Sequence, residues 1–113
     1  MHELSLCENI RDLIEDQAKT SGFTHVNKVW LEVGAFSCVD PEALRFGFQA
    51  VMAGSVAEGA LLDIATPQAE ARCPACNEIS PVEQRYDLCP TCGMPGLEVI
   101  RGDALKVTKL EVV

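Results

Sequence analysis

The 113-residue chain contains few residues of the types on which most enzymes and nucleic-acid-binding proteins depend. It has two histidines, one tryptophan and one tyrosine, and only nine basic residues against seventeen acidic ones. Two histidines, neither next to a suitable nucleophile in sequence, leave little material for a hydrolytic triad. A phosphate-binding Gly-x-x-x-x-Gly-Lys-Ser/Thr loop is also lacking, so nucleotide hydrolysis would have to come from a partner. We therefore do not expect an enzyme.

Long apolar segments are lacking as well. No apolar run approaches the roughly 18 residues that a membrane span requires. Residues 1–4 do not form the basic region followed by an apolar stretch that marks a secretory signal. We therefore expect a cytoplasmic protein that does not enter a membrane.

Basic residues are too few, and too dispersed, for a nucleic-acid-binding surface. Residues 1–66 carry a net charge of −6, residues 67–101 carry −2, and residues 102–113 are balanced. A protein that grips nucleic acid needs a basic stripe against the phosphates, and the cysteine-rich region is mildly acidic instead. This charge balance suits a protein that meets protein partners or cations.

The most informative motif is a pair of Cys-Pro-x-Cys sequences separated by twelve residues. Two such turns present four thiolates, the ligand set that tetrahedral zinc accepts in structural sites. Each pair is followed by a residue that tolerates the positive φ of a metal-binding turn, Asn77 in one case and Gly93 in the other. The sequence therefore predicts a closed structural zinc site formed by Cys73, Cys76, Cys89 and Cys92.

The same cysteines also fit other uses. Disulfides would need an oxidising compartment, and a redox-active motif would be a single pair that opens a helix. Iron binds the same turns in rubredoxin-like electron carriers, but only Tyr86 supplies an aromatic ring between the pairs. A zinc-ribbon adaptor without an exchangeable metal also remained open.

Hydrophobic periodicity predicts an α+β fold in which two helices pack on a small three-stranded sheet, with a zinc-ribbon-like four-cysteine module inserted. Ser5-x-x-Glu8 has the form of a capping box, and Asp40-Pro41 that of an N-cap followed by proline. The expected helices cover about 4–20 and the segment from Pro41 to Gly54, and the expected strands cover 26–33, 62–66 and 105–112. The predicted domains are an α/β domain of residues 1–67 with 102–113, and a zinc-binding domain of residues 68–101.

The remaining apolar and sulfur-containing side chains are expected to be structural. His25 is expected to face solvent without a role. Cys7 and Cys38 are interpreted as small buried thiols, although Cys38 is close enough to Asp40 in sequence to lie near a metal. The residues expected in the core are Trp30, Phe46, Phe48 and Met52.

A histidine near a chain terminus is most often a solvated side chain, but His2 also allows a second metal site at the amino terminus. The amine of Met1, the backbone nitrogen of His2 and its imidazole can close fused chelate rings around one cation, and Glu3 adds a carboxylate. Nitrogen donors in one plane suit square-planar or tetragonal Ni(II) or Cu(II).

Taken together, these motifs resemble those of the HypA/HybF hydrogenase maturation factors. The resemblance rests on residues 1–7 (MHELSLC), 29–39 (VWLEVGAFSCV) and 54–59 (GSVAEG), and on the four-cysteine module. It implies a nickel metallochaperone that helps to insert exchangeable Ni(II) into the large subunit of [NiFe]-hydrogenase, together with a GTPase partner. It also implies that Met1, His2 and Glu3 bind nickel, that Asp40 lies near it, and that the four cysteines hold structural Zn(II). We expect a monomer or a homodimer that binds neither nucleic acid nor membranes.

Overall fold

The structure is a computed structural model that describes residues 3–113, which form two compact units. Unit 1 contains the described residues up to Leu31 together with 39–64 and 106–113, and unit 2 contains 32–38 and 65–105. Residues 32–38 thus belong to the same unit as the cysteine pairs. The predicted assignment of nickel to one domain and zinc to the other is a functional one, and it stays a prediction.

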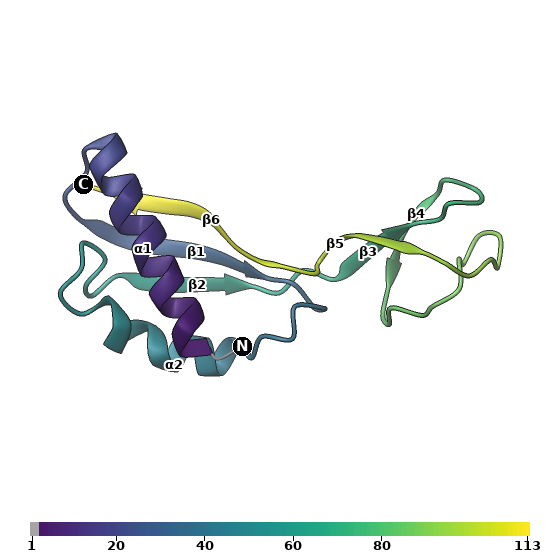
Figure 1. The fold of residues 1–113 in the computed structure, drawn as a ribbon, viewed down its shortest axis with the longest axis horizontal. Coiled ribbons are helices and arrows are strands. Elements are labelled where there is room, and N and C mark those ends of the chain that lie inside the picture. Colours follow the sequence, from purple (N-terminus) through teal and green to yellow (C-terminus); the bar gives the residue numbers. More distant parts are fainter. Residues whose placement is uncertain (1–2) are drawn as a thin grey trace. The chain divides into compact units, whose positions relative to one another are not determined.

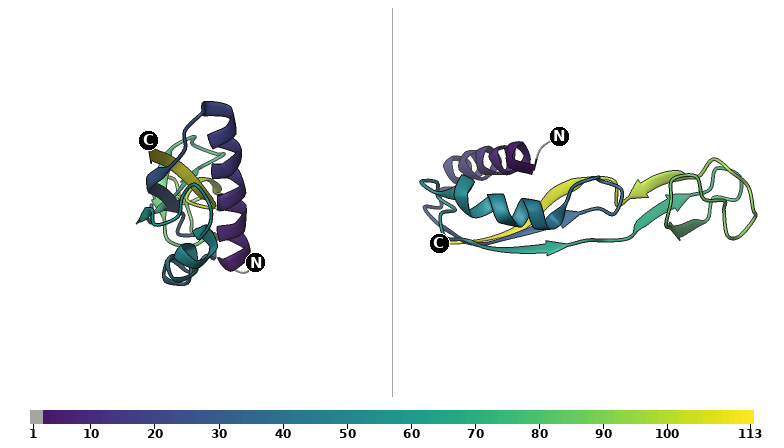
Figure 2. Two further views of the ribbon diagram at one scale, coloured as in Figure 1. Left: turned by 90° about the vertical axis from the view of Figure 1, so that its left-hand side faces the viewer. Right: turned by 90° about the horizontal axis from the view of Figure 1, so that it is seen from below.

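Unit 1 is built from two helices on one side of a three-stranded sheet, with the strand order β2-β1-β6 (Figures 1 and 2). This arrangement confirms the predicted fold class. The bounds are α1 (Glu3–Ser21), β1 (Val26–Val33), α2 (Pro41–Met52), β2 (Leu61–Ala65) and β6 (Leu105–Val112). No helix among residues 3–113 is long and apolar enough to cross a bilayer.

The core of unit 1 forms where α1 and α2 contact each other and the inner face of β1. In β1, alternate residues Val29, Leu31 and Val33 are buried, as the period of two in the sequence predicts. Each fully buried side chain of this size stabilises the fold by about 1.5–3 kcal/mol relative to an exposed one. The helices contribute the buried residues Cys7, Ile10, Ile14, Ala18, Leu44, Phe48 and Met52.

Helix α1 covers the predicted range to within one residue at each end, but its start is not capped as predicted. The capping-box interpretation is wrong, because the helix begins at Glu3 and Ser5 is therefore its third residue. At the other end, Gly22 adopts φ +80°, and its N–H donates to the carbonyl of Ala18 at 2.8 Å. This left-handed glycine turns the chain out of the helix toward β1.

Helix α2 is capped at both ends by side chains. The carboxylate of Asp40 accepts from the N–H of Glu42 at 3.0 Å, which confirms the predicted N-cap. The last turn of α2 contains no basic residue. Arg11 of α1 supplies one instead, because its guanidinium donates to the carbonyls of Val51 at 2.8 Å and Ala53 at 3.3 Å.

Three expectations about burial are wrong. Phe46 is 89% exposed, because it lies on the side of α2 opposite to Leu44 and Phe48. Trp30 is only half-buried, since its neighbours Val29 and Leu31 take the inner face of β1. Cys38 is exposed and adopts φ +61° in the turn after β1.

Unit 2 is a second three-stranded sheet, with the strand order β4-β3-β5 and antiparallel pairing throughout. The strands are β3 (Ala69–Arg72), β4 (Ile79–Val82) and β5 (Glu98–Arg101). The buried apolar cluster of this unit is small. It consists of Ala69, Ala71 and Val82, with Phe36 and Leu97 packed against it.

Unit 2 also contains a close approach of three backbone segments. The N–H of Gly34 donates to the carbonyl of Ala104 at 3.0 Å, and that of Phe36 donates to the carbonyl of Gly102 at 2.8 Å. A Cβ on Gly34 would overlap the carbonyl group of Gly102, and a Cβ on Gly102 would lie 2.6 Å from the Cα of Ala69. Glycine is therefore required for steric reasons at both positions.

This close approach yields a stability prediction. We expect Gly34→Ala to lower the free energy of unfolding by about 1–3 kcal/mol or more, because backbone atoms must move to admit a methyl group. The matched control is Gly47→Ala in α2, where the nearest atom to an added Cβ is Leu4 Cδ1 at 3.6 Å. That variant should gain about 0.5–1 kcal/mol from helix propensity. Denaturant unfolding measures both, and equal stability of the two variants would contradict the prediction.

Candidate metal centre

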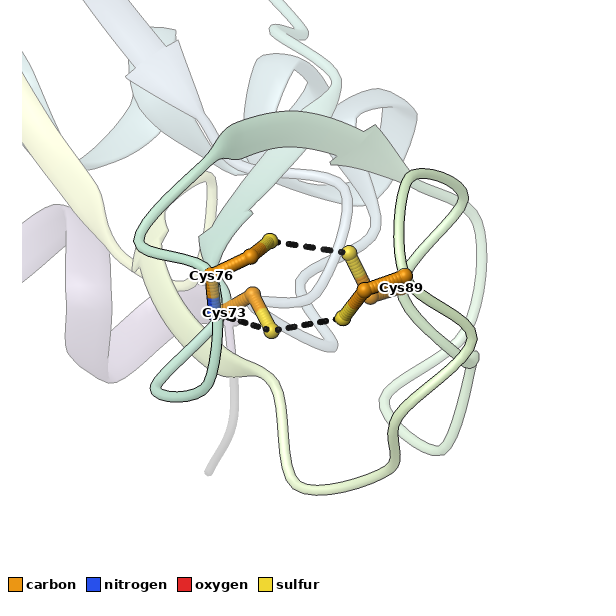
Figure 3. Close-up of side chains that lie close together, drawn as sticks. Cys73, Cys76 and Cys89 are labelled. Atoms are coloured by element: carbon orange, nitrogen blue, oxygen red, sulfur yellow. Dashed lines mark hydrogen bonds between the residues drawn. The ribbon is translucent and has the colours of Figure 1, made fainter.

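The four paired cysteines of unit 2 converge on one point. Their sulfur atoms all lie within 4.8 Å of one another. Cys73 Sγ lies 3.5 Å from Cys92 Sγ, and Cys76 Sγ lies 3.7 Å from Cys89 Sγ, so each short contact joins one pair to the other (Figure 3). All four are free thiols, which excludes the disulfide alternative for this structure.

Both turns are built in the same way. The N–H of Asn77 donates to the carbonyl of Cys73, and that of Gly93 donates to the carbonyl of Cys89, each at 2.8 Å. Asn77 adopts φ +65° and Gly93 adopts φ +77°, as the residue types at these positions predict. Two separate segments of the chain thus reach the same backbone conformation.

Each turn is closed by a carbonyl that the sequence does not reveal. The N–H of Cys73 donates to Glu78 at 2.9 Å, and the N–H of Cys89 donates to Met94 at 3.0 Å. In both cases the acceptor lies five residues after the first cysteine. Because a backbone acceptor carries no residue signature, only the matching spacing of the two motifs could have indicated these contacts.

The backbone of the turns favours thiolate at the first cysteine of each pair. The N–H groups of Cys92 and Thr91 lower the pKa of Cys89 to about 6. The N–H of Cys76 similarly lowers the pKa of Cys73. At Cys76, the N–H of Glu78 has the same lowering effect, but burial and the neighbouring sulfurs outweigh it and raise the pKa to about 12. Four neighbouring sulfurs therefore do not all ionise without a cation among them.

The geometry fits a tetrahedral ion. Metal–sulfur bonds of about 2.3 Å in a tetrahedron place the sulfurs about 3.8 Å apart. The observed separations of 3.5 and 3.7 Å agree with this value. Four sulfur donors also fill the coordination shell, which leaves no open position for a reacting molecule. The arrangement can hold an ion as a scaffold and is not built to use it in catalysis.

The other two cysteines lie outside this cluster. Cys7 is fully buried in unit 1, as expected, and its Sγ lies 3.5 Å from the carbonyl of Leu44. Burial, with smaller contributions from the carboxylates of Glu3 and Glu8, raises its pKa. Cys38 is exposed, with its Sγ 3.8 Å from the carbonyl of Phe36. His25 is exposed, as expected.

The predicted amino-terminal site is described only in part. Met1 and His2 lie outside the described residues. Glu3 begins α1, and its Oε2 accepts from the N–H of Asp40 at 3.3 Å. The structure therefore joins the carboxylate of Glu3, at the start of α1, to the backbone of Asp40, the N-cap of α2, which stands 37 positions away in the sequence.

The fold and the thiolate cluster together define a small α+β metal-binding protein. Comparison with known proteins makes the assignment specific. Residues 1–112 match the model of the family described as "Hydrogenase/urease nickel incorporation, metallochaperone, hypA". The chain belongs to the HypA family, whose members are metallochaperones of hydrogenase maturation and not enzymes.

Curated relatives match over nearly the whole chain. The hydrogenase maturation factor HypA of Acidithiobacillus ferrooxidans (strain ATCC 53993 / BNL-5-31) is 50% identical over 112 residues, which cover 99% of each chain. HypA of Azotobacter chroococcum mcd 1 is 48% identical over the same coverage. The solution structure of the Ni metallochaperone HypA from Helicobacter pylori matches with a TM-score of 0.78 and 24% identity, covering 100% of this chain and 98% of that one. This last likeness confirms the fold.

The convergence of the sulfurs predicts a selective effect of substitution. We expect Cys92→Ser to lose the metal ion, because the sulfur of Cys92 is one of the four candidate ligands. The loss should destabilise unit 2, because the small apolar cluster of this unit contributes little to its folding free energy. The matched control is Cys38→Ser, an exposed cysteine outside the cluster, which should keep the ion. Native mass spectrometry counts the metal, and a full metal complement in Cys92→Ser would contradict the assignment.

Proposed function

We propose that this protein binds Ni(II) at its amino terminus and carries it to a hydrogenase precursor. The nickel ligands would be the amine of Met1, the nitrogens of His2 and the carboxylate of Glu3, with Asp40 close by. The observation that supports this site most directly is the contact of 3.3 Å between Glu3 Oε2 and the N–H of Asp40. It joins the Glu3 carboxylate to the backbone of Asp40, an acidic residue, at the point where the first helix begins.

The reach of the chain also supports this site. A residue two positions from Glu3 can lie no more than about 7 Å from its Cα. The proposed ligands of Met1 and His2 are therefore close in the chain to the Glu3 carboxylate. The exposed carboxylate of Glu42 adds further negative charge in the first turn of α2, and a divalent cation is attracted to such a cluster.

We further propose that the four-cysteine site holds Zn(II) permanently. Zinc accepts four thiolates without a geometric preference of its own, whereas nickel in biological sites with planar geometry favours nitrogen donors. The two ligand sets belong to different units of the chain. This division lets one ion stabilise the fold while the other is exchanged.

The position of the nickel ligands at one end of the chain would allow the nickel to be passed to an acceptor. Donors supplied by a chain end can be replaced one at a time by those of an acceptor. The acceptor we propose is the large subunit of [NiFe]-hydrogenase. A maturation GTPase would supply the nucleotide hydrolysis for which this chain has no phosphate-binding motif. We place the process in the cytoplasm, where thiols stay reduced and available to a metal.

Removing the imidazole of His2 should affect the binding of nickel and leave the binding of zinc unchanged. We expect His2→Ala to abolish stoichiometric Ni(II) binding and to leave the zinc bound, and an extension that blocks the Met1 amine should do the same. The control is His25→Ala, which removes the only other histidine. Calorimetry measures the nickel affinity, which should rise with pH in the native protein because the ligands must lose protons. Unchanged nickel affinity in His2→Ala would refute the site.

The role of Asp40 can be separated from its function as a helix cap. Asn caps a helix as well as Asp does, so Asp40→Asn should keep the melting temperature while weakening Ni(II) binding about tenfold, as removal of a supporting ligand partner does. The control is Glu42→Gln, which removes the same charge from the same helical turn. Equal losses of nickel affinity in both variants would show that only general electrostatics is involved.

A further inference from the structure

Unit 2 has a hollow in its surface that is not part of the metal centre. Its volume is about 520 Å³, which lies within the size range of ligand pockets. Its apolar lining comes from β4 and from the segment around the second cysteine pair, and consists of Pro81, Val82, Leu88 and Pro90. We call this region the β4 hollow.

The walls of the β4 hollow are held in place by the protein itself. The loop after β4 is closed by Asp87, whose Oδ2 accepts from the N–H of Glu83 at 2.9 Å and from that of Gln84 at 3.1 Å. The N–H of Asp87 donates in turn to the carbonyl of Gln84 at 3.1 Å. Leu88 directly precedes Cys89, one of the four converging cysteines. A surface that is already ordered loses less conformational entropy when a partner binds.

The β4 hollow leaves apolar surface in contact with water. Leu88 is 59% exposed, and Pro81 and Pro90 are exposed as well. Val82 is buried and belongs to the small apolar cluster of unit 2, so the lining is continuous with the interior. An aliphatic side chain placed in the hollow would remove apolar surface from water on both partners.

Both charged residues of the lining are acidic. Glu83 is exposed and Asp87 is half-buried. Neither forms an ion pair with a basic group among residues 3–113. Arg85 stands between them in the sequence, but its guanidinium is engaged elsewhere. It donates to the carbonyl of Phe36 at 3.3 Å and lies 5.1 Å from the centroid of the Phe36 ring. The lining therefore carries two negative charges without a cation of its own.

The charges on the adjoining face of the sheet do not supply that cation. Pro81 pairs with Glu70, and alternation places Arg72 on the same face of β3. Strand β5 adds Glu98 opposite Arg72, and Arg101 opposite Glu70. Arg101 is in ion-pair contact with Glu70 at 3.7 Å and with a carboxylate of β1 at 3.9 Å. The two acidic and two basic residues of β3 and β5 balance, so the surplus negative charge is that of the two lining carboxylates.

We propose that the β4 hollow is a docking site for a segment of a partner protein that carries an arginine or a lysine next to an aliphatic side chain. The aliphatic side chain would lie against Pro81, Leu88 and Pro90, and the cation would lie beside Glu83 and Asp87. Nucleic acid is a poor occupant, because its phosphates would meet two carboxylates. A second copy of this chain is also less suited, since its net charge is −8. The proposal does not depend on the identity of the nickel ligands.

Amide chemical shifts of the isotope-labelled, zinc-loaded protein without nickel test this proposal. The probe is a nine-residue peptide with Leu-Arg-Leu at its centre and Gly and Ser elsewhere, and the two control peptides carry Leu-Glu-Leu and Ser-Arg-Ser. We expect saturable shifts at the amides of Val82 and Leu88 with the first peptide, weakened by added salt, and much weaker binding of both controls. The absence of saturable shifts up to about 10 mM peptide, or equal binding of either control peptide, would overturn the proposal.

Matched variants localise the binding. Leu88→Ser should weaken binding of the Leu-Arg-Leu peptide about fivefold or more, because it removes an aliphatic contact. Its control is Leu61→Ser, which replaces an exposed leucine of unit 1 and should leave binding unaltered.

Glu83→Gln should weaken binding about two- to fivefold, the range for one exposed charge pair. This change keeps the backbone N–H that Asp87 binds, so the loop should stay closed. Its control is Glu78→Gln, which makes the same change of charge at an exposed residue of unit 2 outside the lining. Equal weakening by the two members of either pair would overturn the proposal.

Other occupants of the hollow would give different results. Shifts at Val82 and Leu88 that depend on protein concentration without peptide would overturn the proposal in favour of self-association. A stronger response of the same amides to a single-stranded oligonucleotide than to the Leu-Arg-Leu peptide would overturn it in favour of nucleic acid.

Discussion

Unit 2 depends on four cysteine sulfurs that converge on one point, where a cation would allow all four to ionise. The apolar cluster of this unit contains two alanines and one valine, with Phe36 and Leu97 at its edge. Such a cluster buries little surface, so a metal bound between the two turns must contribute a large part of the folding free energy. Backbone N–H groups already favour thiolate at Cys73 and Cys89, which prepares the turns for an ion.

Unit 1 is stabilised by different means, and this difference matches the proposed division between a resident ion and an exchanged one. Its core has large buried side chains from both helices and from β1, and needs no metal to hold it. Under the proposed division, an ion held at the beginning of the chain would be exchanged without loss of this fold. The contact between Glu3 and Asp40 makes that region acidic.

Much of this structure could be predicted from the sequence because the relevant signals are local. The cysteine spacing, the residues Asn77 and Gly93, and the N-cap at Asp40 each fix a short stretch of backbone. Interactions between distant segments could not be predicted. Two examples are the contact of Glu3 with Asp40 and the close approach of Gly34 to Gly102. In each case no sequence motif links the two residues. The exposure of Phe46 was missed because residue type alone suggested burial.

The guanidinium of Arg11 has a consequence for how the two helices move. Glu3 contacts the first residue before α2, and Arg11 contacts the last turn of the same helix. Hydrogen bonds thus join the two helices near both ends of α2. The earlier residue of α1 contacts the start of α2, and the later residue contacts its end. Sliding one past the other by a single turn, about 5.4 Å, would break both attachments at once.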